Sequence, residues 1–308
     1  MAPRKNEDVL PDDAKARKRI VSFDYIRTTV IILVLLHHAV LAYTTFAFLN
    51  PTNPIDTFSP VVDSQRWSGF GTAGPLWFLW LLLAFNVLIV VLYRIAPHLG
   101  GSIISRLSSL FNRPLAFFGV LFGITTVAYL PLVLLFGFDH WTTIGPITFQ
   151  TSRILLYLAY FLVGTAIGVY GIDRTMFNSK NTFASRGWIG MVVSPVSFFV
   201  MLIFLVNPTG LIFYGIAFTF TCAAAVLGFI AIFLRFTKQH KGIIDSLSDN
   251  SFGIYIIHYV IVIWLQFWLL EIQLPAILKA SIVFLGTLIL SWGIIAAIRR
   301  IPVVARVI

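Results

Sequence analysis

Eight long stretches of apolar residues constrain this chain more than any other feature. A helix needs about 20 consecutive apolar residues to cross the hydrocarbon core of a bilayer. Stretches of about that length run approximately over residues 20–48, 73–93, 114–138, 151–171, 187–206, 211–236, 251–270 and 274–298. Each is expected to be helical, because lipid offers no partner for an unpaired backbone N–H or C=O group. The sequence therefore predicts an all-α, polytopic bundle of about eight transmembrane helices.

The composition agrees with a membrane location and excludes several other classes of protein. Hydrophobic residues make up 58% of the chain and charged residues 11%, and the mean hydropathy is +0.91. Soluble proteins carry roughly 25% charged residues. A single cysteine, Cys222, excludes a disulfide framework and a Cys-based metal site. We attribute the net charge of +10 to basic residues on the cytoplasmic side of a membrane, and we expect contacts with lipids but none with nucleic acid.

The basic residues also predict the orientation of the chain. With eight spans, both termini lie on the same side, and of the 22 Lys and Arg residues only Arg66, Arg153 and Lys279 fall on the other side. Positive charge collects in the cytoplasm, so we expect a multi-pass protein of the cell (inner) membrane with cytoplasmic N- and C-termini. The expected organisation is a disordered basic cytoplasmic tail over residues 1–19, one transmembrane domain over 20–301 and a cytoplasmic tail over 302–308.

The first apolar stretch carries ionisable residues, which are costly inside a membrane and are therefore candidates for function. Arg27 and His38 are 11 residues apart. This spacing is three helical turns plus about 20°, so both side chains lie on one face, about 16 Å apart along the axis. Asp24 precedes Arg27 by three residues and is close enough to pair with it. His37 is rotated from His38 by about 100° and need not share its surroundings.

The spacing suits a long, thin ligand with an anionic head at the interface and a reactive end inside the bilayer. The Arg27 guanidinium is a strong phosphate ligand, and the His38 imidazole is a good general base near neutral pH. Acyl-coenzyme A has this shape. Two simpler interpretations stay open for these residues taken one at a time. Arg27 can be a snorkelling anchor paired with Asp24, and His38 can be an interhelical hydrogen-bond donor.

Further candidates lie on the seventh and second stretches. Ser251, Tyr255 and His258 are spaced i, i+4, i+7 and form one stripe on a helix. We expect His258 about 10 Å above the inner end of its helix, at a lesser depth than His38, either beside the path of a pantetheine arm or as a packing residue. Trp77 is either part of an interfacial aromatic belt or a platform for a sugar ring.

Two arginines follow the second stretch. Arg106 and Arg113 lie in the loop before the third span, where they either hold coenzyme A phosphates together with Arg27 or simply keep the loop in the cytoplasm. The sequence contains no helix with a His-Glu-x-x-His motif and no glycine-rich phosphate loop, and we expect no metal site.

Three motifs occur in the order in which one known family carries them. Asp24-x-x-Arg27 is followed after ten residues by His38, residues 74–79 read Gly-Pro-Leu-Trp-Phe-Leu, and residues 251–258 read Ser-Phe-Gly-Ile-Tyr-Ile-Ile-His. In these motifs the chain resembles the acyltransferase-3 family of integral-membrane O-acyltransferases, with Phe252 where the family has Tyr. Family members usually have about ten helices, and some carry a fused esterase-like domain that is not found here. The second motif is similar to that of the glucan-succinylating branch.

The resemblance implies an enzyme that moves an acyl group, acetyl or succinyl, from acyl-coenzyme A to a hydroxyl of a carbohydrate in the cell envelope. Arg27, with Asp24 and one of Arg106 and Arg113, would hold the anionic end of the donor. His38 would act as general base or, in a less favoured variant, carry the acyl group. No permanently bound cofactor is implied. The alternatives are a transporter or flippase for a glycan or lipid-linked intermediate, since intramembrane Asp, Arg and His also suit proton relays, and a structural subunit of another enzyme.

Overall fold

The computed structural model describes residues 21–49, 77–145, 147–178, 182–205, 210–237, 242–270 and 272–305, and within these ranges it is mostly helical. The tail expected over residues 1–19 lies outside them, as do Arg66 and the first three residues of the Gly74–Leu79 motif. In chain order the described elements are α1 Val21–Leu49, α4 Trp77–Ile95, α5 Pro97–Leu107, η3 Leu110–Asn112, α6 Pro114–Phe136, β1 Trp141–Ile144, β2 Ile147–Gln150, η4 Thr151–Arg153, α7 Ile154–Tyr170, η5 Ile172–Arg174, α8 Thr182–Ser185, α9 Gly187–Leu205, α10 Leu211–Phe236, α11 Gly242–Trp268, α12 Ala276–Ile298 and α13 Pro302–Ala305.

Eight of the described helices are long and apolar enough to cross a membrane, namely α1, α4, α6, α7, α9, α10, α11 and α12. The predicted all-α transmembrane bundle is thereby confirmed. Helix boundaries follow local signals. For example, α6 begins with Pro114, whose fixed φ suits the first helical position. The same helix ends before Gly137, which has a positive φ of 79° that residues with a Cβ rarely adopt.

The start of α11 differs most from the prediction. The helix begins at Gly242 and not at Ser251, because the added turns are polar and hydropathy does not mark them. Ser248 and Asn250 are nevertheless buried. The side-chain amide of Asn250 is satisfied there, since it donates to the carbonyl of Ser246 and accepts from Arg299, whereas the hydroxyl of Ser248 has no hydrogen-bond partner among the described residues. Hydrogen bonding of this kind makes the burial of a polar helix end possible.

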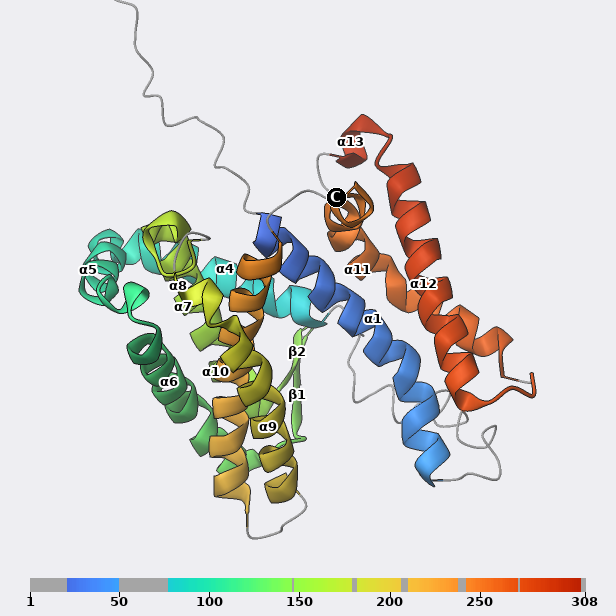
Figure 1. Cartoon of the computed structure of the whole chain (residues 1–308), viewed down its shortest axis with the longest axis horizontal. Helices are drawn as coiled ribbons and strands as arrows, with labels where there is room; N and C mark the ends of the chain where they lie inside the picture. The colour runs from blue at the N-terminus through green and yellow to red at the C-terminus, as the bar shows by residue number, and fades with distance from the viewer. Residues whose placement is uncertain are drawn as a thin grey trace, which may run out of the picture.

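The transmembrane helices form two groups, which Figure 1 shows on either side of the view. In one group α1, α11 and α12 pack against one another, and in the other α10 packs against α6 and α9. Helix α1 joins the groups at its first turn, where the hydroxyl of Ser22 donates to the carbonyl of Thr237 at the end of α10, at 3.0 Å. The side chain of Phe23 also packs against the core of the second group.

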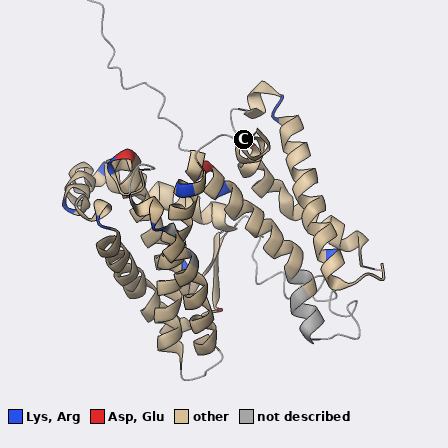
Figure 2. Ribbon diagram, viewed as in Figure 1, with Lys and Arg blue, Asp and Glu red and all other residues tan. Residues whose placement is uncertain are grey.

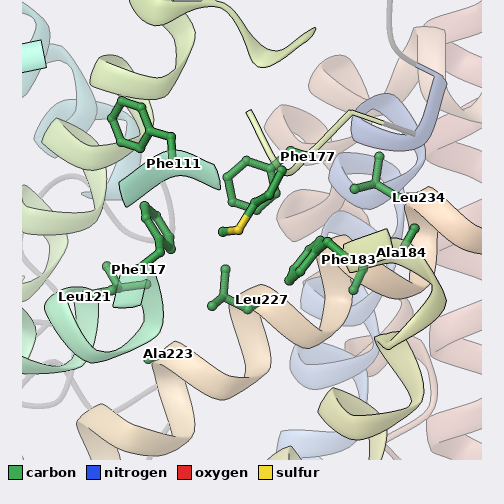
Figure 3. Packing of buried hydrophobic residues seen from close by; sticks show 11 residues of the cluster. Phe111, Phe117, Leu121, Phe177, Phe183, Ala184, Ala223, Leu227 and Leu234 are labelled. Atoms are coloured by element: carbon green, nitrogen blue, oxygen red, sulfur yellow. The ribbon is translucent and has the colours of Figure 1, made fainter. Parts of the chain in front are cut away.

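The main hydrophobic core lies in the second group, where short segments fold over the ends of α6 and α10. Figure 3 shows Phe111 of η3, Phe117 of α6, Phe177 and Phe183 gathered around Leu227 of α10. Their rings meet in tilted and edge-to-face pairs, a geometry that aromatic quadrupoles favour. This packing fixes one end of α6 relative to α10.

The described Lys and Arg residues gather at one end of the molecule. Figure 2 shows most of the described Lys and Arg at the end of the molecule that carries α5, α8 and α13. The exceptions among the described residues are Arg153, at the start of α7, and Lys279, near the start of α12. The chain is therefore a multi-pass integral membrane protein with one strongly basic face, which we call the basic face.

Candidate active site

Arg27 links the beginning of α1 to α11. Its Nη2 lies 3.6 Å from Oδ1 of Asp24, as the spacing predicts. Its Nε donates to the hydroxyl of Ser251 at 3.1 Å, and Nη2 donates to the carbonyl of Ser248 at 3.2 Å. The side chain remains 51% exposed. Because a guanidinium carries five N–H groups, these contacts fix its position and leave donors for an anion.

The imidazole of His38 lies beside that of His258, on α11. The two ring centroids are 5.5 Å apart. The ring of Tyr259 is also 5.5 Å from His38, and the ring of Tyr255 is 5.6 Å from His258. The residues that the sequence selected on the first and seventh helices therefore meet in one cluster, which we call the histidine cluster. His37 is exposed, but its ring centroid also lies 5.5 Å from that of His38.

His258 is buried, with 1% of its surface exposed. Its Nδ1 is 2.5 Å from the carbonyl oxygen of Tyr255. A carbonyl only accepts hydrogen bonds, so Nδ1 must donate and the neutral ring then keeps a lone pair on Nε2. That Nε2 is buried and has no hydrogen-bond partner among the described residues. Nε2 of His258 is therefore a hydrogen-bond acceptor that no described group uses, and it belongs to the ring next to that of His38.

The backbone around His38 is held firmly. Gln266 of α11 donates to the carbonyl of His38 at 3.2 Å, which satisfies the amide of a buried polar side chain. The next residue, Ala39, is fully buried and packs with Val262 of α11 and Val283 of α12. Two helices therefore fix the depth and rotation of α1 at the point where it carries His38.

The depth expected for His258 was wrong. We expected it at a lesser depth than His38, but the two rings are adjacent. The reason is the early start of α11. His258 comes 16 residues after Gly242 and His38 comes 17 residues after Val21, so each lies about 25 Å along its own helix. The contacts of Arg27 with Ser251 and of His38 with His258 indicate that α1 and α11 run in the same direction.

A polar hollow of about 530 Å³ lies at the basic face, between the start of α11 and the end of α12. Asp245, Asp249, Arg299 and Arg300 are among the residues that line it. The hollow borders α1, because the hydroxyl of Tyr25 bonds to Asp245 at 2.5 Å. A second hollow, about 440 Å³ and apolar, lies between α9 and α10. His38 lines neither of these two hollows.

Arg106 and Arg113 are not brought to Arg27 by the described contacts. Arg106 is exposed on the last turn of α5, and Arg113 is exposed where α6 begins. Figure 1 shows α5 on the opposite side of the view from α11 and α12. The arginines that lie near the polar start of α11 are Arg299 and Arg300, which the sequence argument used only for orientation. The sequence feature that could have identified them as candidates is their position, two adjacent arginines directly after the last span.

Trp77 belongs to a different cluster from the histidines. It opens α4, and its ring lies 5.7 Å from that of Trp141 on β1 and 6.1 Å from that of Tyr157 on α7. The positions of Trp77 and Trp141 in the sequence put both near the same side of the membrane, but their contact with each other and with Tyr157 depends on the packing of separate elements. In the described part of the chain no three His, Cys, Asp or Glu side chains are grouped so that they could hold a metal ion.

A family model for an acyltransferase domain covers residues 61–296, which is most of the chain. The matched range includes Trp77 and residues 251–258, but it begins after α1 and so leaves out Asp24, Arg27 and His38. No curated protein and no solved structure matches this chain.

Proposed function

The chain belongs to the acyltransferase-3 family and is an acyl-transfer enzyme, and from that premise we propose that it transfers an acetyl or succinyl group from acyl-coenzyme A to a carbohydrate hydroxyl. The observation that carries the proposal is the histidine cluster, about three helical turns from Arg27 along α1. A cation near the membrane surface and an imidazole pair deep in the bundle match the two ends of an acyl-coenzyme A molecule.

The basic face is proposed to be cytoplasmic, with both termini on that side. The gathering of Lys and Arg at this end supports the assignment. Acyl-coenzyme A is made in the cytoplasm, so its phosphates would meet Arg27 first. Cell-membrane localisation, with a single transmembrane domain over residues 20–301 between the tails 1–19 and 302–308, belongs to the same proposal.

The donor phosphates are assigned to Arg27, Arg299 and Arg300. The polar hollow offers room beside the polar turns of α11, and two guanidinium groups line it. Guanidinium groups bind phosphate oxygens in bidentate fashion. Asp24 would hold Arg27 in place through the ion pair at 3.6 Å. Because Arg106 and Arg113 lie on other elements, we give them the simpler role of keeping their loop at the basic face.

The chemical step is assigned to His38. Its neutral imidazole would take the proton of the acceptor hydroxyl as the hydroxyl oxygen attacks the thioester carbonyl. The C–S bond then breaks, and the leaving thiolate takes the proton from the imidazolium. His258 would support this step, because its Nε2 lone pair can accept an N–H of the charged His38 ring. Ser251 and Tyr255 would line the path of the pantetheine arm along α11.

The test is thiol release from acetyl- and succinyl-coenzyme A by the purified full chain in lipid nanodiscs, with and without an oligosaccharide acceptor. Acceptor-dependent release and an acylated sugar in the mass spectrum are the expected results. The His38→Ala variant should lose both. Turnover equal to wild type in that variant would remove the proposed chemistry, and carbohydrate flux without thiol release would indicate a transporter.

A further inference from the structure

A second polar cluster lies away from the basic face, around Arg153 at the start of α7. The guanidinium carbon of Arg153 is 5.0 Å from the centroid of the Phe218 ring on α10. Three phenols are close enough to interact with its charge, those of Tyr129 on α6, Tyr157 on α7 and Tyr214 on α10. We call Arg153 and these tyrosines the arginine cluster. Arg153 thus points into the helix group and does not simply extend along the membrane surface.

Several polar atoms of this region are buried and unpaired. The Nε of Arg153 and the hydroxyl of Ser152 have no hydrogen-bond partner within the described ranges, and the buried hydroxyl of Tyr129 has only Arg153 and Tyr214 near enough to interact with it. Tyr129 and Ser152 have no exposed surface. No carboxylate in the described part of the chain forms an ion pair with Arg153. Unpaired buried polar groups are rare in native proteins, and each calls for an explanation. A bound anion would satisfy the Nε of Arg153.

A rigid frame holds Arg153 in this position. The hairpin of β1 and β2 turns at Gly145, which has a positive φ of 58°, and pairs Trp141 with Gln150. Directly after it, the hydroxyl of Thr151 bonds to His140 at 2.8 Å and to Thr142 at 2.6 Å. These bonds fix η4, on which Arg153 lies. A side chain that is held in advance loses little entropy when a ligand arrives.

Aromatic rings lie next to the arginine cluster. Tyr157, which interacts with Arg153, also contacts Trp77, and Trp77 meets Trp141 edge to face at an interplanar angle of 89°. Trp77, Trp141 and Tyr157 are half-buried, so their surfaces remain partly open. Indole faces suit the apolar faces of sugar rings, whereas a guanidinium suits a carboxylate or phosphate. A site that combines both kinds of group is suited to bind a sugar that carries a negative charge.

We propose that the arginine cluster and its tryptophans form the acceptor subsite, and that the acceptor is an anionic carbohydrate. This inference rests on the proposed function. It explains why a basic residue lies away from the basic face, against the usual charge bias. It also places donor and acceptor on opposite sides of the membrane. Tyr129 lies seven residues before the end of α6, which puts the inner part of the subsite about 10 Å from that helix end.

The experiment measures saccharide binding to the full chain in nanodiscs without any donor. The probes are a glucuronate-containing oligosaccharide, a neutral oligosaccharide of equal length, a sugar phosphate and free succinate. Wild-type protein should bind one of the two anionic sugars at least about tenfold more tightly than the neutral one, as expected for a charge-assisted hydrogen bond. The anionic sugar that binds more tightly identifies the preferred anionic group as a carboxylate or a phosphate.

Three variants test the assignment. Arg153→Gln should remove the preference for the anionic sugar and leave binding of the neutral sugar unchanged. Arg153→Lys should keep part of the preference, which guards against a folding defect. Arg94→Gln, on an exposed arginine of the basic face, is the matched control and should bind like wild type. Equal binding of charged and neutral sugars by wild type, or an equal loss of both in Arg153→Gln, would overturn the proposal.

Free succinate tests whether the carboxylate that binds at Arg153 belongs to the donor's succinyl group and not to the acceptor. If free succinate competes with the anionic sugar at Arg153, the subsite takes the donor's acyl carboxylate and the acceptor assignment is wrong. Thiol release from acyl-coenzyme A is recorded in parallel. A failure of the proposed function would abolish this release in wild type, whereas a failure of the acceptor subsite would leave it intact.

Discussion

His38 and His258 lie with their ring centroids 5.5 Å apart, although one is on the first membrane helix and the other on the seventh. Arg27 makes a second link between the same two helices, through Ser251. Helices α1 and α11 therefore contact each other at two depths. The interface joins the exposed Arg27 to a pair of imidazoles, one half-buried (His38) and one buried (His258), which would hold the two ends of a donor molecule.

Replacement of His38 by Ala should lower kcat at least about 100-fold, because the general base is lost. The KM for acyl-coenzyme A should change little, since the imidazole does not hold the phosphates. Thiol release at saturating acceptor measures both constants. His98→Ala, which removes an exposed histidine on α5, is the control and should behave like wild type. Equal losses in the two variants would contradict a specific role for His38.

Replacement of His258 by Gln should lower kcat by about tenfold, the size expected for one hydrogen bond to a charged group, and should leave KM near wild type. The amide fills a similar space, but its geometry differs from that of the Nε2 lone pair. Steady-state kinetics of thiol release separates the two constants. An unchanged kcat would show that His258 only packs against His38.

Replacement of Arg27 by Gln should raise the KM for acyl-coenzyme A by about tenfold or more and affect kcat less, because the lost contact is with a charged phosphate group. The effect should shrink as salt is added, since exposed charges are screened. The assay is thiol release at 50 and 300 mM salt. Arg94→Gln controls for general surface charge. A fall in kcat without a change in KM would place Arg27 elsewhere in the mechanism.

The close approach of α9 and α10 predicts a stability effect at Gly190. A Cβ added there would lie 2.3 Å from the Cα of Gly228, so the helices would have to separate. Gly190→Ala should therefore destabilise the fold by about 1–3 kcal/mol. Gly164→Ala is the control, because a Cβ at Gly164 meets nothing within 4 Å. The midpoints of thermal unfolding in detergent compare the two, and equal midpoints would contradict the tight packing.

The orientation predicts which loops are accessible from outside the cell. After Cys222 is replaced by Ala, a single cysteine is introduced at Asp139 or at Asp173, both exposed and at opposite ends of the spans. A membrane-impermeant thiol reagent should label Asp139→Cys in intact cells and Asp173→Cys only after permeabilisation. The reverse pattern would place the basic face outside.

The transmembrane architecture was determined by the sequence itself. Hydropathy located the eight spans, because a lipid environment imposes both length and helical structure on every crossing segment. Periodicity placed Asp24, Arg27 and His38 on one face, and the ion pair of the first two is present. These predictions succeeded because they depend on residues close together in one helix.

Only the tertiary structure decided which helices meet. The contact of His38 with His258, and the place of Arg299 and Arg300 beside the polar start of α11, depend on how helices pack. The same holds for the tyrosines around Arg153, which come from three helices. Local periodicity carries no information on these neighbours, because side chains far apart in sequence are brought together by the packing of whole helices. Hydropathy also missed the polar first turns of α11, where neighbouring side chains such as Tyr25 and Arg299 bond to Asp245 and Asn250.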